Sequence, residues 1–258
     1  MAQEAAHTLD AFHRGRFWLV QPKQTGHRAG ADALILAAAV PAAFCGRLAD
    51  FGAGAGAAAL AVAARCPGAE VQLVERSPEM AHFAGLSLAH SQNAGLSARA
   101  SLLVADVGLA GAAREKAGLA AGSFDFVIMN PPFNGPADRS SPDELRRQAH
   151  VMDDGLFAAW LKSGAAVLRR RGSVAIIARP PAIASILAVM HGRFGAAELV
   201  PVHARADAAA IRVVIRARLG SRAALSLMPP LVLHEASGNA FSARAEGIFA
   251  GEDALFGD

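Results

Sequence analysis

The chain has 258 residues, of which 53% are hydrophobic, and this is enough for one large domain with a sizeable core. The formal net charge of +3 excludes a strongly acidic protein and is compatible with a polyanionic partner. The longest apolar stretch, residues 34–44, contains Pro41 and is too short to cross a bilayer, and no signal peptide pattern is found. We therefore expect a cytoplasmic protein without a membrane span. The scattered cysteines and histidines predict no metal site.

Residues 1–45 are predicted to form a small N-terminal extension that packs on a main domain of residues 46–258. Within it, residues 1–10 have the composition of a loose terminus, and residues 15–21 read as a strand closed by Pro22. The apolar run 33–40 follows Asp32 and predicts a helix that ends before proline.

From residue 46 the chain alternates between short apolar runs and longer helical patterns, which is typical of an α/β fold with a parallel sheet. Residues 134–150 are polar and contain two prolines, so they are predicted as a long loop. Two runs near the C-terminus are separated by a short turn, so we expect them to pair antiparallel. The predicted strands are 47–51, 70–74, 101–104, 124–129, 173–178, 198–203 and 211–219, with an extra strand at 231–234; the predicted helices are 57–65, 78–94, 155–170, 182–194 and 238–250.

A glycine-rich turn follows the first strand of the main domain. Its residues Gly52, Gly54 and Gly56 permit a sharp turn and let a ligand approach the backbone closely. Taken alone, this turn also satisfies the dinucleotide pattern G-x-G-x-x-G/A.

Carboxylates at the ends of three successive predicted strands narrow the choice of ligand. Asp50 can accept hydrogen bonds from an ammonium, or from ordered water beside a sulfonium, and would repel a pyrophosphate. Glu75 stands where a carboxylate accepts both ribose hydroxyls, and Asp106 can accept from the exocyclic amine of an adenine. All three are predicted to line the sheet edge where open α/β folds bind ligands.

The segment Asn130-Pro131-Pro132-Phe133 follows the predicted strand 124–129. Two prolines cannot donate ladder hydrogen bonds, so the strand must stop there. An amide side chain, backbone carbonyls and an aromatic ring remain, and this set suits a planar amino group such as the exocyclic nitrogen of a base.

Residues 50–56, Glu75, Asp106 and residues 130–133 together resemble the motifs of the S-adenosylmethionine-dependent amino-methyltransferases. Residues 15–21, 30–32 and 231–251 are similar to blocks of the bacterial valine-tRNA adenine-N6 methyltransferase family, although that family more often has tyrosine at position 133, and threonine or serine at position 31. The resemblance implies the Rossmann-like, seven-stranded class I methyltransferase sheet, mostly parallel with an antiparallel strand near the C-terminus. It implies S-adenosylmethionine as cofactor and S-adenosylhomocysteine as product. The residues it assigns to the cofactor are Asp32, Asp50, Gly52, Gly54, Gly56, Glu75, Asp106 and Asn130.

The expected function is N-methylation of the exocyclic amino group of a nucleic-acid base, with adenine N6 in tRNA as the first choice. Asn130 and Pro131 would accept the two amino hydrogens through their oxygens, and Phe133 would stack on the base for on the order of 1–3 kcal/mol. Pro132 completes the catalytic segment. The same geometry suits a glutamine amide in a protein or guanine N2 in rRNA, so both stay as alternatives. A cofactor- or RNA-binding module without turnover is the non-enzymatic alternative, and a dinucleotide oxidoreductase is disfavoured by Asp50.

Basic residues flank these motifs on both sides in the sequence. Contact with RNA phosphates is the expected role, and solvated surface charge is the alternative. Arg169, Arg170 and Arg171 are predicted at a helix C-terminus, where the helix dipole favours them, and Arg212, Arg216 and Arg218 on the wet face of a strand. The candidate RNA-binding residues are Arg16, Lys23, Arg28, Arg146 and Arg147.

Overall fold

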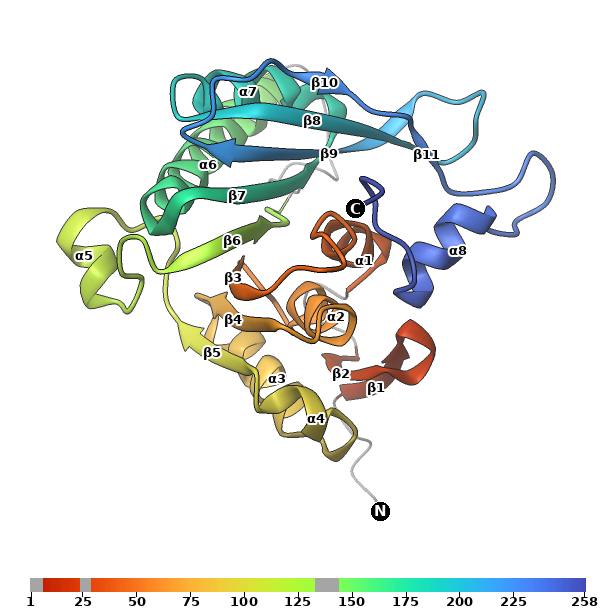
Figure 1. The fold of residues 1–258 in the computed structure, drawn as a ribbon, viewed down its shortest axis with the longest axis horizontal. Coiled ribbons are helices and arrows are strands. Elements are labelled where there is room, and N and C mark those ends of the chain that lie inside the picture. Colours follow the sequence, from red (N-terminus) through yellow and green to blue (C-terminus); the bar gives the residue numbers. More distant parts are fainter. Residues whose placement is uncertain (1–6, 24–28, 133–143) are drawn as a thin grey trace.

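The computed structural model describes residues 7–23, 29–132 and 144–258, with side chains in the last segment described from residue 155 onward. Helices cover both faces of a central sheet (Figure 1). The helices are α1 (Ala31–Ala37), α2 (Ala57–Arg65), α3 (Pro78–Ala89), α4 (Ala94–Ser97), α5 (Gly111–Lys116), α6 (Glu144–Val167), α7 (Ile183–Met190) and α8 (Ala243–Ala250). The strands are β1 (His7–Phe12), β2 (Phe17–Pro22), β3 (Gly46–Phe51), β4 (Ala69–Glu75), β5 (Ala100–Val104), β6 (Phe124–Met129), β7 (Leu168–Ala178), β8 (Phe194–His203), β9 (Ala210–Leu219), β10 (Ser226–Leu227) and β11 (Leu231–Val232).

The strands of the sheet follow the order β10-β8-β9-β7-β6-β3-β4-β5, and β11 pairs with β8. β9 runs antiparallel to its neighbours β7 and β8, whereas the other pairs in this sheet are parallel. The predicted α/β fold is therefore confirmed, including the antiparallel strand near the C-terminus. The two-residue strands β10 and β11 extend the seven longer strands at the β8 edge. No helix in the described segments is long and apolar enough to cross a membrane.

Strand β6 shows how the sheet is buried on both faces. Phe126 and Ile128 belong to the core cluster that contains α1 and α2, while Val127 and Met129 belong to the cluster that contains Trp160 of α6. Successive side chains on a strand point to opposite faces, so one apolar run supplies both cores. This burial explains why the strand reads as a continuous hydrophobic run.

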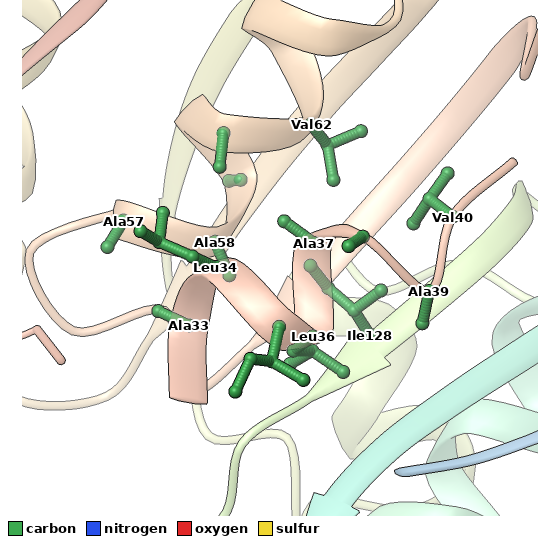
Figure 2. Packing of buried hydrophobic residues seen from close by; sticks show 14 of the residues in the cluster. Ala33, Leu34, Leu36, Ala37, Ala39, Val40, Ala57, Ala58, Val62 and Ile128 are labelled. Atoms are coloured by element: carbon green, nitrogen blue, oxygen red, sulfur yellow. The ribbon is translucent and has the colours of Figure 1, made fainter. Parts of the chain in front are cut away.

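Helix α1 packs tightly against α2 and the sheet. Figure 2 shows Leu34 of α1 beside Ala57 and Ala58 of α2, and Leu36 beside Ile128 of β6. Alanine on α2 lets the two helices approach closely because it adds little volume between their axes. The packing fixes the start of α1, and with it Asp32, next to the glycine turn that precedes α2. The division of the chain at residue 45 stays a prediction, but α1 shares the core of the main sheet.

The prediction of a loose terminus is wrong for residues 7–10. These residues belong to β1, which pairs antiparallel with β2 in a separate two-stranded sheet. The Asn93 side chain holds this hairpin on the domain, because its Oδ1 accepts from the Trp18 N–H at 2.9 Å and its Nδ2 donates to the Trp18 carbonyl at 2.6 Å. The sequence pattern that would predict this strand is weak, because β1 is only half-buried and every second residue along it is exposed.

Two predictions around α6 and β7 are also wrong. Helix α6 begins at Glu144, so residues 144–150 are helical and not part of a loop. Strand β7 begins at Leu168, which pairs with Phe124, so Arg169 lies in a strand and the helix-dipole explanation fails. Its Nη1 instead contacts Asp125 Oδ1 of β6 at 2.8 Å. Both residues lie near the start of their strands, and their side chains are partly exposed to solvent. This exposure explains why charged side chains are tolerated at this point of the sheet.

Candidate functional site

The register of the parallel strands brings the predicted motifs to one edge of the sheet. Phe51, the last residue of β3, pairs with the residue before Glu75 on one side and the residue before Asn130 on the other. Gly52, Glu75 and Asn130 therefore leave three adjacent strands at the same level. Asp106 follows β5, the next strand outward. This is the carboxyl edge, where open α/β sheets bind ligands.

The glycine turn between β3 and α2 adopts a backbone that other residues disfavour. Gly52 has φ +70°, and a Cβ at this position would collide with Trp160 of α6. Gly54 has φ +57° and donates its N–H to Glu75 Oε2 at 2.8 Å. Gly56 precedes α2 as its N-cap residue. The turn thus exposes backbone without side chains, as the sequence predicts.

Glu75 shapes the turn from the end of β4. The residue is 8% exposed, and its Oε1 accepts from the Ser77 N–H at 2.8 Å while Oε2 accepts from the Gly54 N–H. Each carboxylate oxygen has a second lone pair, so the two backbone hydrogen bonds leave room for a ligand hydroxyl on each. The arrangement is compatible with the predicted contact to a ribose.

Asp50 is buried beneath the turn. It is 2% exposed, and its Oδ2 accepts from the Ala59 N–H of α2 at 3.0 Å. Burial raises the pKa of this carboxyl to about 7; the Ala59 hydrogen bond opposes the rise and the charge of Glu75 adds to it. The environment therefore holds a carboxyl that a nearby cation would help to ionise.

Asp106 caps its own turn. Its Oδ1 accepts from the Gly108 N–H at 2.7 Å, and its Oδ2 lies 3.8 Å from Arg76 Nη1. Nearly half of the side chain is exposed. Its predicted contact to an adenine amine stays a prediction.

A cavity of about 320 Å³ opens at this edge, which is a size typical of small-molecule sites. The polar side chains in its lining come from α1 and from three strands of the sheet. Arg212 of β9 is among them, and its Nε donates to Asp32 Oδ2 at 2.8 Å. The sequence pattern predicts a solvated strand face for this arginine, so its position at the cavity is a finding of the structure. The polar lining residues are Asp32, Asp50, Asn130 and Arg212.

The remaining predicted residues lie in different places. Pro131 is buried and Pro132 is exposed, while Phe133 and Arg28 fall outside the described residues. Arg146 and Arg147 lie in α6, where side chains are not described. Lys23 is exposed just after β2. Arg16 is not brought to the cavity, because it lies at the opposite end of β2 and donates to the Gly251 carbonyl at 3.4 Å.

The cavity fits S-adenosylmethionine in its donor set. Carboxylates at Asp32 and Asp50 suit a ligand with an ammonium and a sulfonium, the bare backbone at Gly52 and Gly54 permits close approach, and Arg212 supplies a positive charge for a carboxylate. The raised pKa of Asp50 is consistent with a carboxyl that a bound cation would ionise.

Comparisons with known proteins agree with this chemistry. Residues 25–205 match the family model described as the methyltransferase small domain. A solved structure from Agrobacterium tumefaciens, described as a predicted O-methyltransferase, is 40% identical, with a TM-score of 0.76 over 87% of this chain and 98% of that one.

More distant similarities concern a protein-modifying and an RNA-modifying enzyme. The release factor glutamine methyltransferase of Deinococcus radiodurans is 38% identical over 112 residues; the match spans 43% of this chain and 34% of that relative's length. The 16S rRNA N2 G1207 methyltransferase of T. thermophilus, solved with AdoMet and guanosine, shares the fold at 20% identity, with a TM-score of 0.52 over 82% of this chain and 50% of that one. The chain belongs to the methyltransferase small domain family and is an S-adenosylmethionine-dependent methyltransferase.

Proposed function

We propose that this enzyme methylates an exocyclic amino group of a nucleic-acid base, with adenine N6 in tRNA as the substrate of first choice. One observation supports the proposal most strongly. The side chain of Asn130 lines the same cavity as Gly52, Gly54 and Asp50, and it leaves its strand level with the glycine turn. An amide therefore stands beside the position expected for a methyl donor.

Asn130 and Pro131 would hold the acceptor by its two hydrogens. The side-chain oxygen of Asn130 accepts one N–H, and the backbone carbonyl of Pro131 accepts the other, which turns the nitrogen lone pair out of the plane of the ring. This is catalysis by positioning and by fixed dipoles. The methylated nitrogen is acidic and releases a proton to solvent, so no strong base is needed.

The residues around the glycine turn would hold the cofactor. When bound, S-adenosylmethionine supplies a methyl group on a positively charged sulfur. Glu75 would accept from the ribose hydroxyls, and the glycines would let the chain follow the ligand closely. Asp50 and Asp32 would balance positive charge in the cavity.

Basic side chains near the same edge support a polyanionic substrate. Arg76 follows β4 at this edge and is exposed, and Lys23 is exposed after β2 of the separate hairpin. Arg205 follows β8 and fixes the adjoining loop through the carbonyls of Glu235 and Gly238 at 2.8 and 2.6 Å. Cations spread along the rim of a site suit phosphate contacts, which position an RNA without reading its sequence.

Methylation of a glutamine amide in a protein is the second candidate. The partial similarity to the release factor glutamine methyltransferase favours it, and a side-chain amide presents the same planar NH₂ group as a base. The description of the Agrobacterium tumefaciens protein as an O-methyltransferase suggests a hydroxyl acceptor. That reaction requires removal of the hydroxyl proton, and the amide of Asn130 is not a base, so we rank it third.

The test is transfer of a labelled methyl group to total RNA or to total protein from a strain that lacks the gene. We expect label in the tRNA fraction, on adenine N6 after digestion to nucleosides. Label on a protein glutamine would replace the first candidate by the second, and label on an ester or ether oxygen would remove both. The N130A variant, incubated in parallel, shows which signal depends on the site.

A further inference from the structure

Asp32 and Arg212 form an ion pair between helix α1 and strand β9, at the wall of the cavity. Asp32 lies in the first turn of α1 and Arg212 in β9, and their Oδ2 and Nε atoms are 2.8 Å apart. Each side chain is 25% exposed, and both line the cavity together with Asn130. The pair therefore presents one negative and one positive group to whatever occupies this space.

Contacts with neighbouring groups hold both side chains at the wall of the cavity. The Nε of Arg212 binds Asp32, and its Nη1 donates to the Ile211 carbonyl at 2.9 Å. A carboxylate accepts on two oxygens, of which Oδ2 binds Arg212. Charges of opposite sign held side by side complement the ammonium and the carboxylate of an α-amino acid.

The other carboxylates near the cavity are less suited to this role. Asp50 is 2% exposed and its Oδ2 holds the first turn of α2 through Ala59. Both oxygens of Glu75 accept from backbone N–H groups, and this residue lies outside the lining of the cavity. Arg212 is the cation of the described lining.

We propose that Asp32 and Arg212 bind the amino-acid end of S-adenosylmethionine, with Arg212 on the carboxylate and Asp32 on the ammonium. This inference rests on S-adenosylmethionine as the methyl donor and is independent of which amino group is methylated. Asp32 has a second task, since it fixes the guanidinium through Nε. Arg212 is thus a residue for cofactor affinity, and β9 contributes to the cofactor site as well as to the sheet.

The test compares two ligands by titration calorimetry in the absence of any methyl acceptor. S-adenosylhomocysteine contains the amino-acid end, whereas 5′-methylthioadenosine shares the nucleoside and thioether but lacks it. We expect R212A to weaken S-adenosylhomocysteine binding by roughly 10- to 100-fold and to leave 5′-methylthioadenosine within about twofold, because a hydrogen-bonded charge pair is lost only with the first ligand. R212K should fall between the wild type and R212A, since it keeps the charge without the planar fork.

The matched control is R218A, which removes an exposed arginine from the same face of the same strand and should bind both ligands as the wild type does. D32N should lose affinity for S-adenosylhomocysteine and keep that for 5′-methylthioadenosine. Equal weakening of both ligands in R212A, or of neither, would overturn the proposal. Loss of RNA binding alone in R212A would also overturn it and would assign Arg212 to the substrate. None of these results bears on the labelled-methyl test of the acceptor.

Discussion

Glu75 and Gly54 are joined by a 2.8 Å hydrogen bond across the end of the sheet, from the backbone N–H of the turn to a carboxylate on the neighbouring strand. The second oxygen of Glu75 accepts from Ser77 at 2.8 Å, where the chain enters α3. One side chain therefore fixes the loops on both sides of the expected ribose position. The ribose contact proposed for Glu75 therefore depends on the same carboxylate that shapes the turn.

We expect E75Q to weaken S-adenosylhomocysteine binding by about tenfold or more, because an amide NH₂ must face one of the two backbone donors and one ligand hydrogen bond is lost. Calorimetry measures the change. E79Q, on the exposed first turn of α3, is the matched control and should bind as the wild type does. Unchanged affinity in E75Q would count against the ribose contact.

Asn130→Ala should abolish methyl transfer while cofactor binding persists. Removal of one fixed dipole from an active site costs about 10² to 10³ in rate, and here the acceptor would also be misaligned. Single-turnover transfer and calorimetry with S-adenosylhomocysteine separate the two effects. An active N130A variant would remove the amide from the mechanism.

Gly52→Ala should destabilise the fold as well as the site. Alanine is strained at φ +70°, and its methyl group would meet the ring of Trp160. The expected loss in unfolding free energy is about 2 kcal/mol or more. Denaturant titration measures it.

Gly155 provides the comparison, because it lies in α6 with open space around it and a helical backbone. G155A should raise the unfolding free energy by about 0.5–1 kcal/mol. If G52A were as stable as the wild type, Trp160 would have to move freely, and the close contact between α6 and the turn would be unimportant.

Asp50→Asn should change how stability depends on pH. An aspartate carboxyl in an unfolded chain has a pKa of 3.8, and in the folded protein burial is the chief cause that raises the pKa of Asp50 to about 7. The folded protein tolerates the protonated carboxyl better than the ionised one. The contribution of Asp50 to the unfolding free energy is therefore fully present below pH 3.8 and is lost as the pH rises through 7. Asparagine does not titrate, and its side-chain oxygen still accepts from Ala59.

The unfolding free energy of D50N should therefore gain on that of the wild type between pH 4 and pH 7, by on the order of a few kcal/mol, and the difference should level off above that range. Denaturant titrations at several pH values measure it. Two curves that run parallel from pH 4 to pH 8 would show that Asp50 ionises normally.

Much of the fold was predictable from local patterns. Helix α2 and strand β6 have the predicted bounds, because each is a continuous apolar segment between clear breakers. Strand β1 is not predicted because it has no continuous apolar run. Its Asp10 instead accepts from Thr8 Oγ1 of the same strand and from Gln21 Nε2 of β2. Arg169 was misassigned because a basic run before glycine is typical of a helix end.

The functional site likewise contains residues that the sequence predicts and one that it does not. Gly52, Glu75 and Asn130 were predictable because the carboxyl ends of parallel strands meet at one edge. Arg212 was not, because its alternation with apolar residues says which face of a strand it occupies and nothing about what lies opposite. Its contact with Asp32 follows from the direction of β9 and from the packing of α1, which depend on the whole fold (Figures 1 and 2).

The reversal of β9 has a consequence for the order of events during synthesis. Asp32 and Arg212 are 180 positions apart in the chain, so the ribosome finishes the glycine turn, all three carboxylates and Asn130 long before β9 exists. A nascent chain that ends after β7 contains the glycine turn, the carboxylates and Asn130 but lacks Arg212, which belongs to the lining of the cavity. If Arg212 binds the cofactor as proposed, the complete cofactor site forms only after β9 has been made and has paired with its neighbours, through contacts between distant parts of the chain.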